Sequence, residues 1–197
     1  MPNPFHPSRR RLLAASAFAA TGLSLGFEEA FAQQPTPQCH DGDEPTVRQT
    51  EGPFFKPQSP QRIELIEPGI GGQPIEITGF VLTRACKPIA GALIDVWQAD
   101  STGNYDNSGF RLRGHQFTDA EGRYRLRSVV PGAYEGRTRH IHVKVQPPGG
   151  CILTTQLYFP GEAKNQRDGL FRKELLIRTA KAGGWLAGRF DFVLEVS

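Results

Sequence analysis

The chain has 197 residues, a formal net charge of +3, 22 glycines and 16 prolines. This length suits one domain with a sizeable core, and the glycine and proline content favours turns and short strands over long helices. The basic residues form no stripe, so the charge pattern argues against a nucleic-acid partner.

The first 32 residues resemble a targeting segment. Three arginines at positions 9–11 precede a mildly apolar stretch at 12–27, and residues 30–32 (AFA) form a small-x-small cleavage site. Residues 8–13 (SRRRLL) resemble a twin-arginine signal, the type that exports folded proteins. A membrane anchor is the alternative, but the apolar stretch is short and polar for a span. We therefore expect a signal peptide at residues 1–32, a periplasmic or secreted protein, and no stable membrane insertion of the mature chain.

The rest of the chain has the pattern of short strands. Residues 33–45 are polar and proline-rich, which predicts a flexible leader before one domain at residues 46–197. No segment has the pattern of a long amphipathic helix. Many short strands at regular spacing predict an all-β fold, an antiparallel β-sandwich. The predicted strands lie at residues 75–82, 92–98, 139–146, 152–159, 171–178 and 189–196. A further strand is predicted through Tyr124 and Leu126, after a turn at 118–122.

Three cysteines follow the targeting segment: Cys39, Cys86 and Cys151. Export implies an oxidising compartment, which permits disulfides. We expect one disulfide with one thiol left over, and the sequence does not choose among the three pairings. The spacing contains no CxxC pair, so it does not indicate a thiolate metal site.

The strand at residues 139–146 carries the sharpest chemical signal. Side chains alternate faces along a strand, so Ile141 and Val143 should face the core while His140 and His142 share the other face. Two imidazoles at this spacing can converge on one metal ion. The alternative is a pair of histidines on a solvent-facing strand, and the spacing alone does not decide between the two.

The next strand favours a metal site. If the chain folds back through the turn at residues 147–150, the best apolar match sets Val143 beside Thr155 and Ile141 beside Leu157. In this register the polar side chains of both strands gather on one face, with His142 opposite Gln156 and His140 opposite Tyr158. A slip of one residue would instead place the histidines against apolar partners.

Two tyrosines follow turn sequences near this region. Tyr105 follows Gly103-Asn104, and Tyr134 comes after Pro131-Gly132. A phenolate is a hard, anionic oxygen ligand, which favours a hard ion such as Fe(III). Taken alone, each tyrosine is more often a core or edge aromatic.

Together these segments resemble the intradiol ring-cleavage dioxygenases, the group of protocatechuate 3,4-dioxygenase and catechol 1,2-dioxygenase. The motifs occur in the family's order and are specific in combination. They are TEGPFF at 50–55, DVWQAD at 95–100, GNY at 103–105, PGAY at 131–134, RTRHIH at 137–142 and TQLYF at 155–159.

The resemblance implies a prealbumin-like β-sandwich whose extended loops carry a non-haem Fe(III) centre. It implies the metal ligands Tyr105, Tyr134, His140 and His142, with Tyr134 as the axial ligand that leaves the metal when substrate binds. It further implies that Arg137 stabilises negative charge on the bound ring, that Gln156 lines the pocket for substrate and oxygen, and that Tyr158 lies behind the ligands.

The implied reaction is cleavage of a catechol-type ring by O2, with both oxygen atoms entering a muconate-type diacid. Residues 138–139 (TR) replace the family's Pro-Ala, and the segment between Tyr134 and His140 is shorter than in the family. The choice of catechol, the role of Arg139 and homo-oligomerisation therefore stay open.

Two other classes of protein remain as alternatives. Residues 88–92 (PIAGA), 118–124 (TDAEGRY) and 131–134 (PGAY) also resemble transthyretin-like binding modules, which carry no chemistry. A secreted copper or zinc protein could be built on the paired histidines. The binding-module alternative does not explain His140, His142, Gln156 and Arg137 together.

Overall fold

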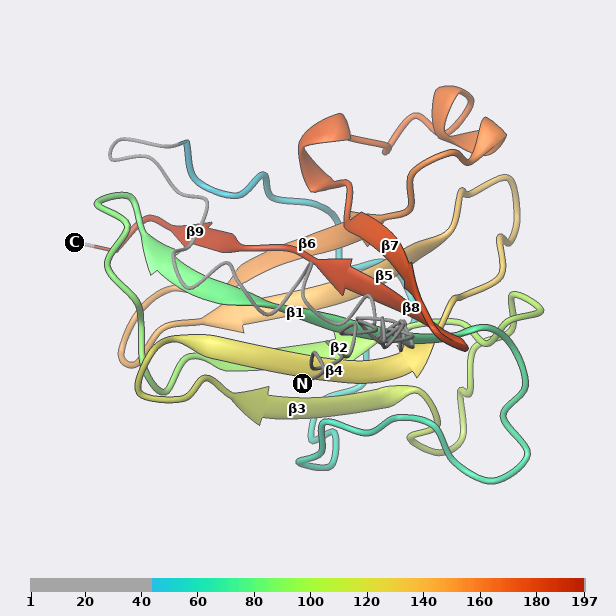
Figure 1. Cartoon of the computed structure of the whole chain (residues 1–197), viewed down its shortest axis with the longest axis horizontal. Helices are drawn as coiled ribbons and strands as arrows, with labels where there is room; N and C mark the ends of the chain where they lie inside the picture. The colour runs from blue at the N-terminus through green and yellow to red at the C-terminus, as the bar shows by residue number, and fades with distance from the viewer. Residues whose placement is uncertain (1–43, 197) are drawn as a thin grey trace, which may run out of the picture.

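Residues 44–196 of the computed structural model form two β-sheets around one apolar core (Figure 1). The predicted signal peptide and nearly all of the predicted leader fall in residues 1–43, which with residue 197 lie outside the described residues. The elements are β1 (Pro74–Thr83), β2 (Leu93–Trp97), β3 (Arg113–Phe117), β4 (Arg123–Val129), β5 (His140–Gln146), β6 (Leu153–Tyr158), the 3-10 helices η1 (Ala163–Gln166) and η2 (Lys173–Leu175), β7 (Arg178–Ala182), β8 (Trp185–Arg189) and β9 (Phe192–Leu194).

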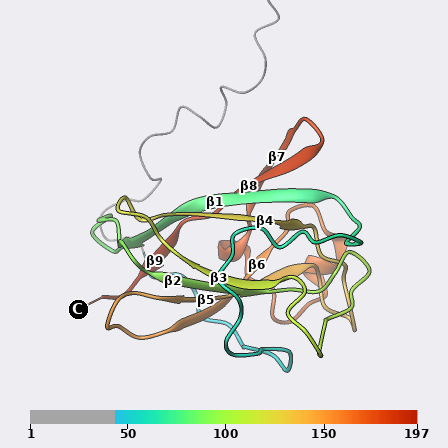
Figure 2. The same ribbon diagram turned by 90° about the horizontal axis from the view of Figure 1, so that it is seen from below.

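The two sheets are mainly antiparallel. One has the strand order β4-β1-β8-β7, with β9 also paired to β1, and the other has the order β3-β2-β5-β6. Strand β1 runs parallel to β8 and β9, and the other pairs are antiparallel. Figure 2 shows the sheets as two layers, with β1 and β4 above β2, β3 and β5. The prediction of an all-β fold rich in antiparallel pairs is confirmed.

The core lies where the apolar faces of both sheets meet. Ile75 and Ile77 of β1 are fully buried, and Ile141, Val143 and Val145 of β5 are at most 1% exposed. Burial of such a side chain contributes about 1.5–3 kcal/mol, so this face of β5 is strongly specified. The two histidines of β5 must consequently lie on the opposite face of the sheet, as the alternation predicts.

The pairing of β5 with β6 has the predicted register. Val143 lies opposite Thr155, and the flanking pairs are His142 with Gln156, Ile141 with Leu157 and His140 with Tyr158. The turn at residues 147–150 that sets this register contains Gly149 with φ +69° and a hydrogen bond from the Gly150 amide to the Pro147 carbonyl. The structure therefore places these polar side chains in two adjacent rows across the sheet.

The predicted strand at residues 171–178 is wrong. Its middle is the 3-10 helix η2, and β7 begins only at Arg178. Leu175 and Ile177 alternate in sequence and are both buried. They lie next to the end of β6, where the Ile177 amide donates to the Tyr158 carbonyl. Alternating burial here reflects docking of an irregular segment against the core.

Between residues 44 and 196 the helices are short 3-10 turns, and none is long and apolar enough to cross a membrane.

Strand β3 was not predicted, because its sequence (RGHQF) has no apolar alternation. Arg113 is nevertheless 1% exposed and Gln116 is 6% exposed. Hydrogen bonds satisfy both buried side chains. Arg113 donates to the Phe54 and Asp106 carbonyls, and the Gln116 amide donates to the Arg125 carbonyl. Paired polar groups replace apolar packing at this edge strand.

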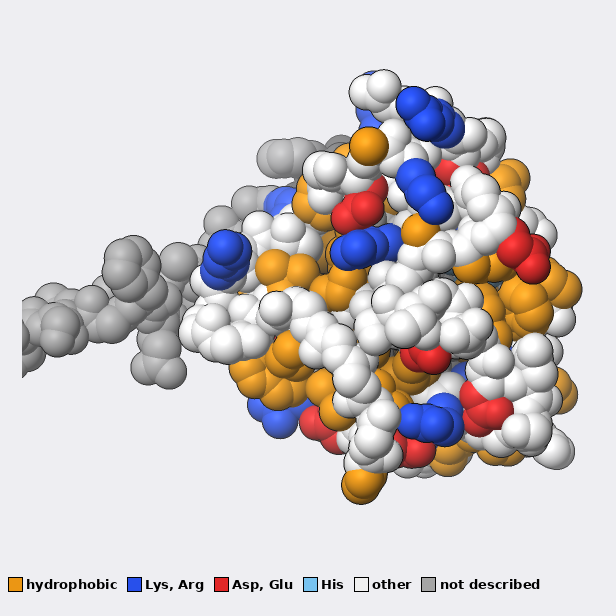
Figure 3. Space-filling model, turned by 90° about the vertical axis from the view of Figure 1, so that its right-hand side faces the viewer, with side chains coloured by type: hydrophobic (Ala, Val, Ile, Leu, Met, Phe, Trp, Pro, Cys, Tyr) orange, Lys and Arg blue, Asp and Glu red, His pale blue; other side chains and the backbone are white. Residues whose placement is uncertain are grey.

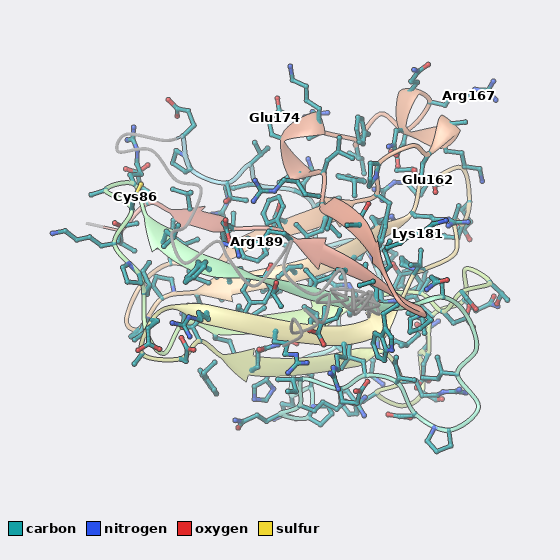
Figure 4. All side chains as sticks on the ribbon, in the orientation of Figure 1. Cys86, Glu162, Arg167, Glu174, Lys181 and Arg189 are labelled. Carbon is teal, nitrogen blue, oxygen red and sulfur yellow. The ribbon has the colours of Figure 1, made fainter. Side chains whose placement is uncertain are left out.

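Cys86, in the loop between β1 and β2 (Figure 4), is disulfide-bonded, whereas Cys151 is free and exposed. Cys39 lies outside the described residues. The prediction of one disulfide and one remaining thiol agrees with the states of Cys86 and Cys151.

Candidate metal centre

The histidines of β5 lie on the outer face of the four-stranded sheet, yet they are buried. His140 is 2% exposed and His142 is 1% exposed. The segment before β1 covers them: the Gln49 amide donates to the Thr154 carbonyl, and Gly52, with φ +71°, lies against His142. A Cβ at Gly52 would lie 3.2 Å from His142 Cε1, so only glycine fits here without displacing the ring. The alternative of a solvent-facing histidine pair does not hold.

The two imidazoles point one ring nitrogen each at the same place. Nε2 of His140 lies 3.1 Å from Nε2 of His142. Nδ1 of His140 lies 2.7 Å from the Thr138 carbonyl oxygen. Because a carbonyl only accepts, this Nδ1 carries the proton and Nε2 keeps its lone pair. Trp97 stacks on the His142 ring at 4.8 Å with an interplanar angle of 8°, which fixes its orientation.

Burial keeps both histidines neutral. It lowers the pKa of His140 to about 4 and that of His142 well below its ordinary value, and the charge of Arg137 acts in the same direction. Neutral imidazole is the form that binds a metal ion. The pair is therefore in its ligating form at neutral pH.

Two tyrosines complete the cluster. The Tyr105 ring lies 5.5 Å from Tyr134 and 6.3 Å from His142, and the Tyr134 ring lies 5.8 Å from His140. Tyr105 Oη is buried and has no hydrogen-bond partner among residues 44–196. Burial raises the pKa of both phenols, and the neighbouring Tyr134 adds to the rise for Tyr105. A buried hydroxyl without a partner is costly. A cation at this point would both coordinate the oxygen and favour its phenolate form.

The loop that carries Tyr105 is held by two carboxylates. Asp100 Oδ1 accepts the amides of Thr102 and Asn104, and Asp106 accepts three backbone amides further on. Gly103 has φ +94°, and a Cβ there would lie 2.7 Å from the Ala133 carbonyl oxygen. This close approach packs the Tyr105 loop directly against the Tyr134 segment.

The Tyr134 segment is a tight turn. Glu135 and Gly136 both have positive φ, at 41° and 79°. The Gly132 amide donates to the Asp100 carbonyl at 2.7 Å, and the Arg137 amide donates to the Tyr134 carbonyl at 2.6 Å. The turn thus places Tyr134, Arg137 and the start of β5 around one point.

The donor set fits a metal ion that accepts phenolate. The part of the chain that is described contains no group of three or more His, Cys, Asp or Glu able to hold a metal. Two neutral imidazole nitrogens therefore need other ligands, and the two phenols stand beside them. Hard, anionic oxygen donors combined with imidazole suit a hard ion such as Fe(III) better than a thiol-seeking metal.

Arg137, Gln156 and Tyr158 form a hydrogen-bonded group beside the four rings. Arg137 Nη2 donates to Gln156 Oε1 at 2.6 Å, and Gln156 Nε2 donates to the Thr50 carbonyl at 2.9 Å. Tyr158 Oη lies 2.9 Å from Gln156 Oε1 and 2.9 Å from the Leu170 carbonyl oxygen. Burial raises the pKa of Tyr158 to about 12, so its hydroxyl stays protonated.

The sequence did not reveal two residues that shape the site. Asp168 accepts Arg137 Nε at 2.8 Å, and nothing in the local sequence marks this loop residue as part of the centre. In the sequence, Trp97 is marked only as one residue of the motif DVWQAD at 95–100. Its place against His142 follows from the β2–β5 register, which no local pattern predicts.

Arg139 lies away from the four rings. Its guanidinium pairs with Glu162 at 3.5 Å, and both side chains are partly exposed. Figure 4 labels Glu162 just before η1. This end of the molecule shows basic, acidic and apolar side chains interspersed, with no field of one sign (Figure 3).

Comparisons with known proteins agree with this geometry. The family model described as dioxygenase matches residues 50–195. The chain is 35% identical over 153 residues to the protocatechuate 3,4-dioxygenase beta chain of Burkholderia cepacia, covering 63% of this chain and 65% of that one. It is 34% identical over 209 residues to catechol 1,2-dioxygenase 2 of Acinetobacter lwoffii, covering 88% of this chain and 74% of the relative. The chain thus spans less than two-thirds of the first relative's length.

Solved structures give the same result. The dioxygenase domain of a dioxygenase–carbohydrate-binding protein fusion from Streptomyces sp. SirexAA-E matches with a TM-score of 0.76 and 55% identity, covering 78% of this chain and all of that one. The 3-chlorocatechol 1,2-dioxygenase of Rhodococcus opacus 1CP matches with a TM-score of 0.71 and 28% identity, covering 77% and 73%. With a family match over most of its length and clustered imidazoles and phenols at the matching motifs, the chain belongs to the intradiol ring-cleavage dioxygenase family.

Proposed function

We propose that this protein cleaves a catechol-type ring between its two hydroxyl-bearing carbons with O2, at a non-haem Fe(III) centre, to give a muconate-type diacid. The proposed ligands are Tyr105, Tyr134, His140 and His142. The observation that carries the proposal is the convergence of two neutral imidazole nitrogens and two phenols beside Arg137. The relatives are named as dioxygenases of catechol, chlorocatechol and hydroxyquinol, which supports a catecholic substrate class.

When bound, Fe(III) supplies a Lewis acid that orients the catechol oxygens and draws electron density from the ring. The residues of the chain supply the proton transfer and the charge stabilisation. Tyr134 is the residue that would accept a proton from a substrate hydroxyl, because burial raises the pKa of its phenol and so favours the protonated form. Tyr134 lies on a tight turn, where it can move without disturbing a strand.

Arg137 is placed to offset negative charge on the bound ring. Its Nε and Nη2 are engaged by Asp168, Gln156 and Tyr158, and its positive charge also acts on the Tyr134 phenol, whose pKa it lowers against the effect of burial. In a site that excludes water, one such fixed cation has a large effect on the barrier. Gln156, held from both ends by Arg137 and the Thr50 carbonyl, forms part of the same wall.

We further propose that the fold is a prealbumin-like β-sandwich at residues 46–197, preceded by a signal peptide at 1–32 and a leader at 33–45. The twin-arginine pattern supports export of a folded protein. The disulfide at Cys86 supports an oxidising destination, because cytosolic proteins rarely keep one.

The visible spectrum of the purified protein tests the metal assignment. Two tyrosinates on Fe(III) give a broad charge-transfer band, so we expect a burgundy protein with one iron per chain. Oxygen uptake with a panel of catechols, and mass spectrometry of the product formed under 18O2, should show incorporation of both oxygen atoms. A colourless protein with stoichiometric zinc or copper, or one that consumes no catechol, would favour a metal-binding or transthyretin-like module.

A further inference from the structure

Hydrogen bonds from two of its nitrogens, Nε and Nη2, fix the guanidinium of Arg137. Nε donates to Asp168 Oδ2 at 2.8 Å, and Nη2 donates to Gln156 Oε1 at 2.6 Å and lies 3.4 Å from Tyr158 Oη. The Arg137 side chain is 17% exposed. The guanidinium also acts on the neighbouring Tyr134 phenol, so it stands beside the four rings, and the contact through Nε decides which way the planar group turns.

Asp168 is built to hold this position. Its side chain is 2% exposed. Besides Arg137 Nε, Oδ2 accepts the Thr138 amide at 2.9 Å, and Oδ1 accepts the Leu170 amide at 2.9 Å. A carboxylate with both oxygens bonded in this way cannot rotate without breaking a bond.

The segment around Asp168 is docked rather than free. Asn165 accepts the Thr138 hydroxyl at 2.6 Å and donates to the Phe159 carbonyl at 2.8 Å. In Figure 4 the neighbouring Arg167 extends away from the sheets at the end of η1. The Asp168 side chain, by contrast, is buried against Arg137. The chain thus delivers one buried carboxylate to the back of Arg137 from a segment remote in sequence.

We propose that Asp168 is a positioning residue for ring cleavage: through its hydrogen bond to Nε it holds the Arg137 guanidinium beside Gln156 and Tyr158, where its charge faces the bound ring. This inference rests on the proposed function. Asp168 itself does not touch the substrate and acts through Arg137.

We expect loss of this contact to lower turnover more than it weakens substrate binding. An arginine freed from Asp168 samples several rotamers, so its charge is misplaced when negative charge develops on the ring. For Asp168→Asn we expect kcat to fall by about 10- to 100-fold, with a much smaller change in KM. Glu162→Gln is the matched control, because it removes a carboxylate from the same segment that pairs with Arg139 and not with Arg137.

A double-mutant cycle decides whether Asp168 acts through Arg137. Asp168→Asn should lower kcat in the wild-type background and add little in an Arg137→Gln background. Asp168→Glu keeps the carboxylate and should recover part of the rate. Equal, multiplicative losses in both backgrounds, or a wild-type kcat for Asp168→Asn, would overturn the proposal. So would a lower rate for Asp168→Glu than for Asp168→Asn. This last comparison stands even if Asp168→Asn folds poorly.

A second measurement does not depend on activity. In 15N NMR spectra of the metal-free protein, Arg137 Nε–H should give a peak protected from exchange, assigned by its absence in Arg137→Lys. Asp168→Asn should shift the peak and speed its exchange, and Glu162→Gln should leave it unchanged. An unchanged peak in Asp168→Asn would contradict the positioning role. If the wild type cleaves no catechol, the proposed function fails, while this spectrum still decides whether Asp168 orients Arg137.

Discussion

Tyr105 and Tyr124 both carry buried hydroxyls, but in opposite environments. Tyr124 Oη donates to the Phe190 carbonyl at 2.8 Å, whereas Tyr105 Oη has no partner within residues 44–196. Tyr105→Phe should therefore leave the metal-free protein at least as stable, while iron binding, the charge-transfer band and the cleavage rate all fall, the rate by more than about 10-fold. Urea unfolding, iron content and oxygen uptake measure these effects.

Tyr124→Phe is the matched control. It leaves the Phe190 carbonyl unpaired, so the free energy of unfolding should fall by about 1–3 kcal/mol, while colour and rate per folded molecule stay unchanged. A bleached Tyr124→Phe protein together with a fully coloured Tyr105→Phe protein would refute the ligand assignment.

The burial of Asp95 predicts the sign with which its contribution to stability changes with pH. Burial raises the pKa of its carboxyl, opposed by the Ser59 hydroxyl and by the charges of His115 and Lys144. A group whose folded-state pKa is raised adds stability below its unfolded pKa of about 3.9, and that contribution is lost as pH rises through the folded value. Asp95→Asn should therefore gain stability relative to the wild type between pH 4 and pH 7 in urea unfolding. A difference that stays constant over this range would contradict the burial argument.

At the scale of elements, the turn before β4 depends on Gly122. Its φ is +73°, and an added Cβ would lie 2.9 Å from the Val81 carbonyl oxygen and 2.9 Å from Pro88 Cβ. Gly122→Ala should therefore lower the free energy of unfolding by more than about 1 kcal/mol. Gly183, between β7 and β8, has φ +58° but nothing within 4 Å of an added Cβ. Gly183→Ala should cost less in the same urea titration, because it adds conformational strain without a clash. Equal losses would contradict the steric argument.

Strands with apolar alternation were predictable, and strands held by polar contacts were not. The β5–β6 register follows from one alignment of core-facing side chains, Ile141 with Leu157 and Val143 with Thr155. The edge strand β3 has no such pattern, since Arg113 and Gln116 are buried by hydrogen bonds made far along the chain. Residues 189–196 were expected as one strand, but β8 ends at Arg189 and β9 begins at Phe192. Between them the Asp191 carboxylate accepts the Phe80 amide at 2.9 Å.

At the scale of the whole molecule, the N-terminal segment should decide where the protein goes. We predict that the exported protein begins at Gln33, because residues 30–32 (AFA) offer a cleavage site. Replacing Arg9 and Arg10 by lysine should retain the full chain inside the cell. Mass spectrometry of the periplasmic fraction measures the N-terminus. An intact Met1 in the membrane fraction would instead indicate an anchor.

The sequence by itself determined the strand-rich fold, the outward pair of histidines on β5 and the motifs that identify the family, because each is a local pattern or a single hairpin register. It did not determine that both histidines are buried, that Trp97 stacks on His142, or that Asp168 holds Arg137. Those contacts join segments of widely different sequence position and depend on strand order and loop docking. Tertiary structure alone decides them, because hydrogen bonds and packing between distant segments leave no periodic trace in the sequence.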